Sequence, residues 1–315
     1  MIEMFHSSEK SPFTKITTLQ KGCWINMLAP TEDELQEISR MLEIDLDFLK
    51  DPLDSEERSR IEYEENQILL IVDIPIVEFG DDKEKTDISF TTYPLGMILL
   101  PDYFITICLK ETPILEEFRT NRIKNCHTAN KNRFLLHLLL KSANYYMRYL
   151  KHINRKTEES EVKLHRSTKN QELFELLNLE KSLVYFTTSL RSNQNVLNRL
   201  NRSKQIKWSD DDDELLEDVV VEFDQALEMT QTYSGILSSL TAAFASVISN
   251  NLNMVMKLLT SITIVLAIPT MVSSFFGMNV RLPFADHPFA FGFIIVATFV
   301  LVISSVIFLY RKDLF

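Results

Sequence analysis

The pattern of apolar and polar positions changes character twice along the chain. Short apolar or alternating runs at 24–28, 67–75, 88–92, 95–100 and 103–108 predict β-strands, and Thr31 with Glu34 forms a capping box that predicts a helix to about Glu43. After Pro113 the apolar residues recur every three or four positions, which predicts helices over about 113–121, 131–166 and 170–203. Strands followed by helices indicate an α+β domain.

A much longer helix is predicted to begin after Ser209, a suitable N-cap residue. Its first turn is acidic, and no proline follows until Pro269. Apolar and small residues then keep a strict three-four spacing, at Leu216, Val219, Phe223, Ala226, Thr230, Tyr233, Leu237, Leu240, Phe244, Val247, Asn251, Met254 and Leu258. At about 1.5 Å per residue, this stalk helix would be a rod on the order of 100 Å long. Such spacing favours packing along the rod, against helices of the same chain or of other copies.

Two uncharged apolar segments close the chain. Residues 258–276 and 288–310 give 19 and 23 positions without a charge, and about 20 are needed to cross a bilayer. Lys257 precedes the first segment and Arg311 and Lys312 follow the second, which by the positive-inside rule places both ends in the cytosol and the short loop outside. The alternative is a pair of buried core helices in a soluble protein.

Composition separates this tail from the rest of the chain. The 315 residues are 45% hydrophobic and 24% charged, with 33 Lys and Arg against 44 Asp and Glu and a net charge of −11. Only four basic and two acidic residues follow position 256, so residues 1–256 carry 29 basic and 42 acidic side chains. An acidic body is a poor match for nucleic acid and a good one for cations.

Local motifs exclude several classes of protein. All six glycines are isolated, so the chain has neither a dinucleotide-binding fingerprint nor a Walker loop. The three cysteines form no CxxC pair, which fits a reducing cytosol, and the N-terminus lacks the pattern of a secretory signal. No GxSxG element is present. We therefore expect no enzyme and no organic cofactor, and His137, His152 and His165 are expected to be surface or packing residues.

One face of the first apolar segment is mostly small or hydroxylated. Steps of three and four residues connect Asn253, Met256, Thr260, Thr263, Ala267, Thr270 and Ser274. A face of this kind in a membrane helix either packs closely on a neighbouring helix or meets water. Since one hairpin cannot enclose a water path, a pore would need several copies with this segment innermost. The second segment, rich in phenylalanine, is expected to face lipid.

The residues that follow this segment, Phe276-Gly277-Met278-Asn279, resemble the Gly-Met-Asn motif of the CorA family of divalent cation transporters. Other stretches are also similar, at 24–31, at Asp73-Ile74-Pro75 and at 253–260. The resemblance covers essentially the whole chain and is most specific over 245–283. It implies an α/β/α sandwich-like cytosolic domain, a long stalk helix and a two-helix transmembrane hairpin, assembled as a funnel-shaped homopentamer in the plasma membrane.

The family also implies a division of the chain. The cytosolic α/β domain would cover 1–205, the cytosolic part of the stalk helix 206–257, the pore-lining span 258–276, the external loop 277–287, the second span 288–310 and the cytosolic tail 311–315. Gly277, Met278 and Asn279 would form the selectivity filter, with Asn279 carbonyls facing the ion, Gly277 permitting a sharp departure from the helix and Met278 anchoring the loop. Below it, Thr270 would be a second polar ring, Met256 and Leu259 a hydrophobic gate, and Asn253 the cytosolic exit.

Magnesium would then be both the transported ion and the regulator. Family members sense cytosolic magnesium through acidic residues between neighbouring subunits, and the candidates here are Asp210, Asp211, Asp212, Asp213 and Asp218. Departures from the family pattern are Arg281 in place of an acidic cluster, Ala267 at a usual methionine before Pro269, and a basic run reduced to Arg311-Lys312.

The leading hypothesis is therefore passive magnesium uptake through a pentameric pore gated by cytosolic magnesium. The same architecture transporting zinc, cobalt or nickel, including by export as in the ZntB branch, is an alternative that the altered loop leaves open. A membrane-tethered cation sensor or scaffold without conduction is an alternative of another class.

Overall fold

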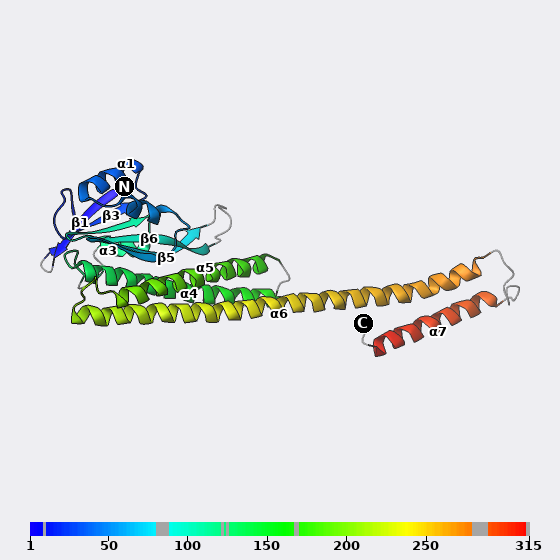
Figure 1. The fold of residues 1–315 in the computed structure, drawn as a ribbon. Helices are drawn as coiled ribbons and strands as arrows, with labels where there is room; N and C mark the ends of the chain where they lie inside the picture. The colour runs from blue at the N-terminus through cyan, green and yellow to red at the C-terminus, as the bar shows by residue number, and fades with distance from the viewer. Residues whose placement is uncertain are drawn as a thin grey trace. The chain divides into compact units, whose positions relative to one another are not determined.

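The computed structural model describes residues 1–8, 11–79, 88–120, 123, 126–166, 170–278 and 289–312 (Figure 1). The chain forms two compact units, Met1–Leu240 and Thr241–Phe315. The long helix α6 (Asp210–Phe276) contributes residues to both units.

The first unit is built on a seven-stranded sheet in the order β2-β1-β3-β7-β6-β5-β4. The strands are β1 (Ile2–Ser8), β2 (Ser11–Ile16), β3 (Cys23–Leu28), β4 (Arg60–Glu64), β5 (Gln67–Phe79), β6 (Ile88–Leu99) and β7 (Tyr103–Cys108). All neighbours are antiparallel except β3 and β7, which are parallel. This single parallel pair requires the chain between them to cross over, and that crossover holds α1 (Glu32–Leu42), α2 (Leu46–Lys50) and the 3₁₀ turn η1 (Asp51–Leu53).

Helices cover both faces of the sheet, as the sandwich-like expectation requires (Figure 1). Because side chains alternate along a strand, Cys23, Ile25 and Met27 face α1 and α2, where they join Leu35, Ile38, Phe48 and Leu49 in one buried cluster. The other face is covered by α3 (Pro113–Arg119), α4 (Lys131–Arg166) and α5 (Asn170–Arg202). The α/β/α arrangement is confirmed.

Trp24 forms the centre of this second face. Its ring stacks on Phe5 with centroids 5.1 Å apart and lies 5.3 Å from Phe134 of α4. Its indole N–H donates to Thr106 Oγ1 (2.8 Å), and that hydroxyl donates to Asn26 Oδ1 (2.9 Å). The three polar groups are buried but satisfied, so they cost little and fix how β3 and β7 lie under α4.

The sequence Asp73-Ile74-Pro75 lies where β5 runs past the end of β4, whose pairing stops at Ile71. Asp73 N–H donates to Asn193 Oδ1 (2.9 Å), and its carbonyl accepts from Asn193 Nδ2 (2.8 Å) and the Tyr146 hydroxyl (2.9 Å). Side chains of α5 and α4 thus replace the missing strand. Because Pro75 lies two residues along on the same open edge, its lack of an N–H breaks no ladder bond.

In the first unit, the part of α6 up to Leu240 packs on α4 and α5. Phe223 lies 6.3 Å from Tyr146, centroid to centroid. Gln194 Nε2 donates to Asp224 Oδ1 (2.6 Å). The three-four series is buried here, as predicted, at Leu216, Val219, Phe223, Ala226, Thr230 and Leu237.

The predicted elements correspond closely to the observed ones, with one error and several omissions. The capping box of α1 is present, and the expected helices at 131–166 and 170–203 are α4 and α5. Residues 88–92 and 95–100 were expected as two strands but form the single strand β6. Pro94 does not break this strand. On one side it lies opposite Asp73, whose backbone N–H and C=O point away from β6. On the other side it lies beyond the β6–β7 pairing, which begins at Leu95. Strands β1, β2 and β4 and helix α2 were not predicted.

Candidate functional site

The second unit consists of α6 from Thr241 onward and α7 (Ala290–Arg311). Both helices contain a stretch long and apolar enough to cross a membrane, and only 6% of each stretch is buried within the chain. If these were core helices of a soluble protein, most of each stretch would be buried within the chain. The phenylalanines of α7 are strongly exposed, with Phe291 at 76% and Phe293 at 78%. Lipid or further copies of the chain would cover such surfaces.

The small and hydroxylated face of α6 is a shallow open groove of about 620 Å³. Thr263, Ala267, Thr270 and Ser274 of the predicted pore-lining set line it, with Leu266 and Met271 at its sides. The remaining predicted positions, Asn253, Met256, Leu259 and Thr260, are exposed on the same helix; Met256 is 58% exposed and Leu259 57%. In the described part of one chain, no other element fills this groove.

The hydroxyl groups in the groove have a defined polarity. Thr263 Oγ1 donates to the Leu259 carbonyl (2.8 Å), and Thr270 Oγ1 donates to the Leu266 carbonyl (3.0 Å). Each hydroxyl proton is therefore committed to the helix, while the oxygen lone pairs stay available. The groove presents hydrogen-bond acceptors, and these attract water protons or cations.

The expected filter begins where α6 ends. The helix stops at Phe276, and Gly277 N–H donates to the Ser273 carbonyl (2.9 Å) as a last helical bond. Gly277 does not take a left-handed φ; a side chain there would approach the Ser273 carbonyl to 3.3 Å. Met278 is 53% exposed. Asn279, Arg281 and the rest of 279–288 lie outside the described residues.

The acidic start of α6 does not form a metal site within one chain. Ser209 Oγ donates to Asp212 Oδ2 (2.7 Å) and accepts from Asp212 N–H (3.3 Å), and Asp212 also pairs with Arg133 (3.4 Å). Asp212 is only 4% exposed, and its carboxylate is used by the N-cap residue Ser209 and by Arg133. The other four candidates, Asp210, Asp211, Asp213 and Asp218, are exposed. Among the described residues, no three acidic, histidine or cysteine side chains are arranged to hold a metal.

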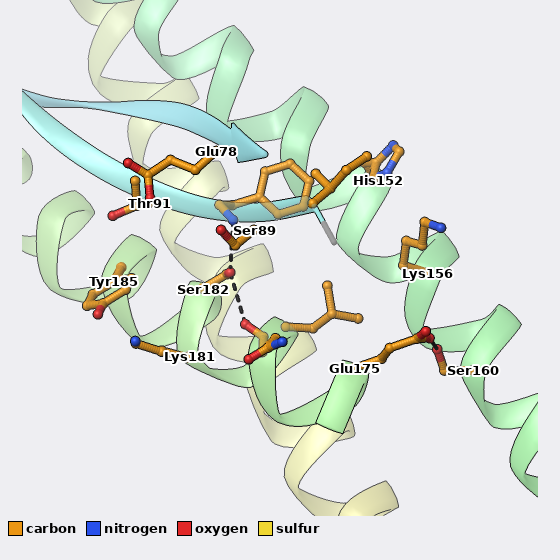
Figure 2. A pocket seen from close by; sticks show the side chains of 14 residues that line it. Glu78, Ser89, Thr91, His152, Lys156, Ser160, Glu175, Lys181, Ser182 and Tyr185 are labelled. Atoms are coloured by element: carbon orange, nitrogen blue, oxygen red, sulfur yellow. Dashed lines mark hydrogen bonds between the residues drawn. The ribbon is translucent and has the colours of Figure 1, made fainter. Parts of the chain in front are cut away.

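Sequence reasoning missed a cavity of about 340 Å³ between the C-terminal half of α4, the N-terminal half of α5 and the start of β6 (Figure 2). Its charged groups are Glu78, Glu175, Lys156 and Lys181, and His152 lies at one end. Glu175 accepts from Ser160 Oγ (3.3 Å), and Glu78 pairs with Lys110.

Burial, and then the neighbouring Arg155 and Lys156, lower the pKa of His152 in this cavity. His137 packs in α4, and the side chain of His165 lies outside the described part of the chain.

Comparison with known proteins agrees with this geometry. Residues 20–311 match the CorA family, described as CorA-like Mg2+ transporter protein. The chain is 28% identical over 295 residues to the cobalt/magnesium transport protein CorA of Methanocaldococcus jannaschii, covering 92% of this chain and 90% of that one.

Two solved structures are similar over nearly the whole chain. The complete structure of the CorA magnesium transporter from M. jannaschii superposes with a TM-score of 0.83 at 25% identity, covering 98% of this chain and 96% of that one. The full-length CmaX protein shares the fold, with a TM-score of 0.71 at 16% identity and coverage of 99% and 97%. A family match over 292 of 315 positions, on a chain with this sheet, this long helix and this apolar C-terminal helix, leaves one conclusion. The chain belongs to the CorA family of divalent cation transporters.

Proposed function

We propose that this protein conducts magnesium passively into the cytosol through a homopentameric pore lined by α6. The observation that carries the proposal is the hydroxylated groove on an otherwise apolar membrane helix, with its proton donors already committed to backbone carbonyls. Copies arranged around an axis would turn this groove into rings of acceptor oxygens.

Neutral oxygen rings suit magnesium in particular. Mg²⁺ loses its bound waters reluctantly, and those waters are strong hydrogen-bond donors. The acceptors at Thr263 and Thr270 would hold the hydrated ion through its waters, and without a carboxylate in the groove the ion would not be trapped. We place the filter at Gly277, Met278 and Asn279, the apolar gate at Met256 and Leu259, and the exit at Asn253.

The proposed topology follows from charge. Spans at 258–276 and 288–310 place the loop 277–287 outside, because Lys257, Arg311 and Lys312 stay in the cytosol with both termini. We infer that cytosolic magnesium closes the pore by binding the exposed carboxylates Asp210, Asp211 and Asp213 between copies. Asp212 is excluded from this role because its oxygens are already used by Ser209 and Arg133.

The test is magnesium flux into liposomes that carry the purified full-length protein. Wild type should conduct, and flux should stop when millimolar magnesium is added to the cytosolic face. Asn279→Ala should lose flux while still assembling; unchanged flux would refute the filter assignment. Competition by zinc, cobalt and nickel decides the ion preference, which the basic Arg281 leaves open. A protein that binds these ions but conducts none of them would instead be a tethered sensor.

A further inference from the structure

The outer face of α5 combines positive charge with exposed apolar groups. Its cations are Lys181, Arg191, Arg199 and Arg202, and all are exposed. Its apolar members are Phe174 (65% exposed), Leu177 (42%), Val184 (54%) and Tyr185 (39%). At 100° per residue these eight positions fall on one side of the helix. Within the described residues, the three arginines take part in no ion pair.

The exposed face of α6 in the same unit has the opposite sign. It presents the carboxylates Asp211, Glu214, Asp218 and Glu228. Val221 (61% exposed) lies between these carboxylates along the helix, and Ile236 (50%) follows the last of them. An acidic face and a basic face are thus left uncovered on two helices of one acidic protein.

The charges on the two helices also match in height. Gln194 donates to Asp224 (2.6 Å), which fixes residues 194 and 224 at one level on these antiparallel helices. Counting equal steps from that bond, Arg199 is level with residue 219, beside Asp218, and Arg191 is level with residue 227, beside Glu228. Both helices rise by about 1.5 Å per residue, so the correspondence is maintained along the face. Val184, ten residues from Gln194, is level with residue 234, near Ile236.

We propose that the α5 face of one copy packs on the α6 face of the next copy. Copies related by rotation about an axis along the helices keep their levels, so Arg191 would meet the neighbour's carboxylate at position 228 and Arg199 the one at position 218. Each copy offers one basic and one acidic face, so the contact is head-to-tail, and with the proposed five-fold rotation it closes into a ring. This inference rests on the proposed homo-oligomer and specifies its cytosolic interface. In this interface Asp218 pairs with an arginine of the neighbouring copy, so it is not a metal ligand.

Cross-linking of the full-length protein in detergent tests the contact directly. Arg191→Cys and Glu228→Cys in one chain, treated with a short bifunctional thiol reagent, should give a ladder of covalent multimers on a denaturing gel. Either single variant should stay monomeric on that gel, and the two single variants expressed together should give dimers only. Lys151→Cys with Glu228→Cys is the matched control, since Lys151 is equally exposed but belongs to another helix, α4. Native Cys23, Cys108 and Cys126 are buried, and burial raises the pKa of the Cys108 thiol to about 11 and that of Cys126 to about 12, so they should not react.

Four results would overturn the inference. A dimer formed by Arg191→Cys alone would mean a two-fold contact. A control pair that gives the same ladder would mean unspecific collision. Absence of a ladder, with native mass measurement still showing a multimer, would refute this interface and leave the proposed oligomer standing; a monomeric native mass would refute both. Independently, Arg199→Glu should shift the native mass towards monomer, and adding Asp218→Arg should restore the multimer.

Discussion

Asn193 is the residue whose removal tests the structure most sharply. It is fully buried in α5 and makes three hydrogen bonds. Its Oδ1 accepts from Asp73 N–H (2.9 Å) and Ser59 Oγ (2.8 Å), and its Nδ2 donates to the Asp73 carbonyl (2.8 Å). These bonds join α5 to the open edge of β5. Since α6 packs on α5, these hydrogen bonds also position the two helices of the proposed interface between copies.

The free energy cost of Asn193→Ala follows from these contacts. Three hydrogen bonds at about 1 kcal/mol each give about 3 kcal/mol, and the Asp73 N–H is left without a replacement partner. Tyr146→Phe removes one of the two hydrogen bonds to the Asp73 carbonyl, and the bond from Asn193 Nδ2 remains. The free energy of unfolding should therefore fall by about 1 kcal/mol. Asn195→Ala is the control, because Asn195 is exposed two residues away and should change stability by less than about 0.5 kcal/mol.

Urea unfolding of the full-length protein in detergent, followed by tryptophan fluorescence, gives these values. Both tryptophans, Trp24 and Trp208, lie in the first unit, so the signal reports that unit alone. The expected order of destabilisation is Asn193→Ala, then Tyr146→Phe, then Asn195→Ala. If the urea midpoint of Asn193→Ala is no lower than that of Tyr146→Phe, Asn193 does not anchor α5 to the open edge of β5 as described.

Three further predictions use the same protein. Gly96→Ala should destabilise by about 1–3 kcal/mol in the urea assay, because a Cβ there would come within 2.3 Å of the Pro52 ring. Burial raises the pKa of Asp73 above its ordinary 3.8, so the folded state holds this proton more tightly than the unfolded state; stability should fall as pH rises from 3.8 through the raised pKa, and Asp73→Asn should flatten that slope. Thr270→Val, which keeps the shape but removes the acceptor oxygen, should reduce magnesium flux at least several-fold while Thr270→Ser retains most of it; equal flux in both would show that Thr270 only packs.

The sequence was sufficient for the elements whose signals are local. The capping box at Thr31 and Glu34, the turn before Tyr103 and the three-four spacing of α6 each specify a structure from neighbouring residues alone, and each is present. The two expected strands at 88–92 and 95–100 are one strand through Pro94. A proline in a strand is harmless or disruptive depending on what lies beside it, and that depends on distant residues such as Asp73 and Cys108.

The candidate site divides in the same way. The hydroxylated face of α6 follows from helical spacing, and the structure adds the direction of the Thr263 and Thr270 protons. The commitment of Asp212 to Arg133 could not be predicted, because 79 residues separate them in sequence. A metal site shared between copies leaves no three-residue cluster in any one chain, so neither periodicity nor a single subunit can reveal it.

The one parallel strand pair sets the order in which this protein can fold. β3 ends at Leu28, but its partner β7 begins at Tyr103, so the centre of the sheet closes only after the whole crossover and the β4–β6 meander have been made. Contacts between residues so far apart carry a large loop-closure cost and slow the folding step. During synthesis, strands β1 to β3 therefore wait with one edge of β3 unpaired until residue 108 has emerged. The apolar C-terminal segments leave the ribosome only after that sheet can be complete, so the first unit has the opportunity to fold before they enter a membrane.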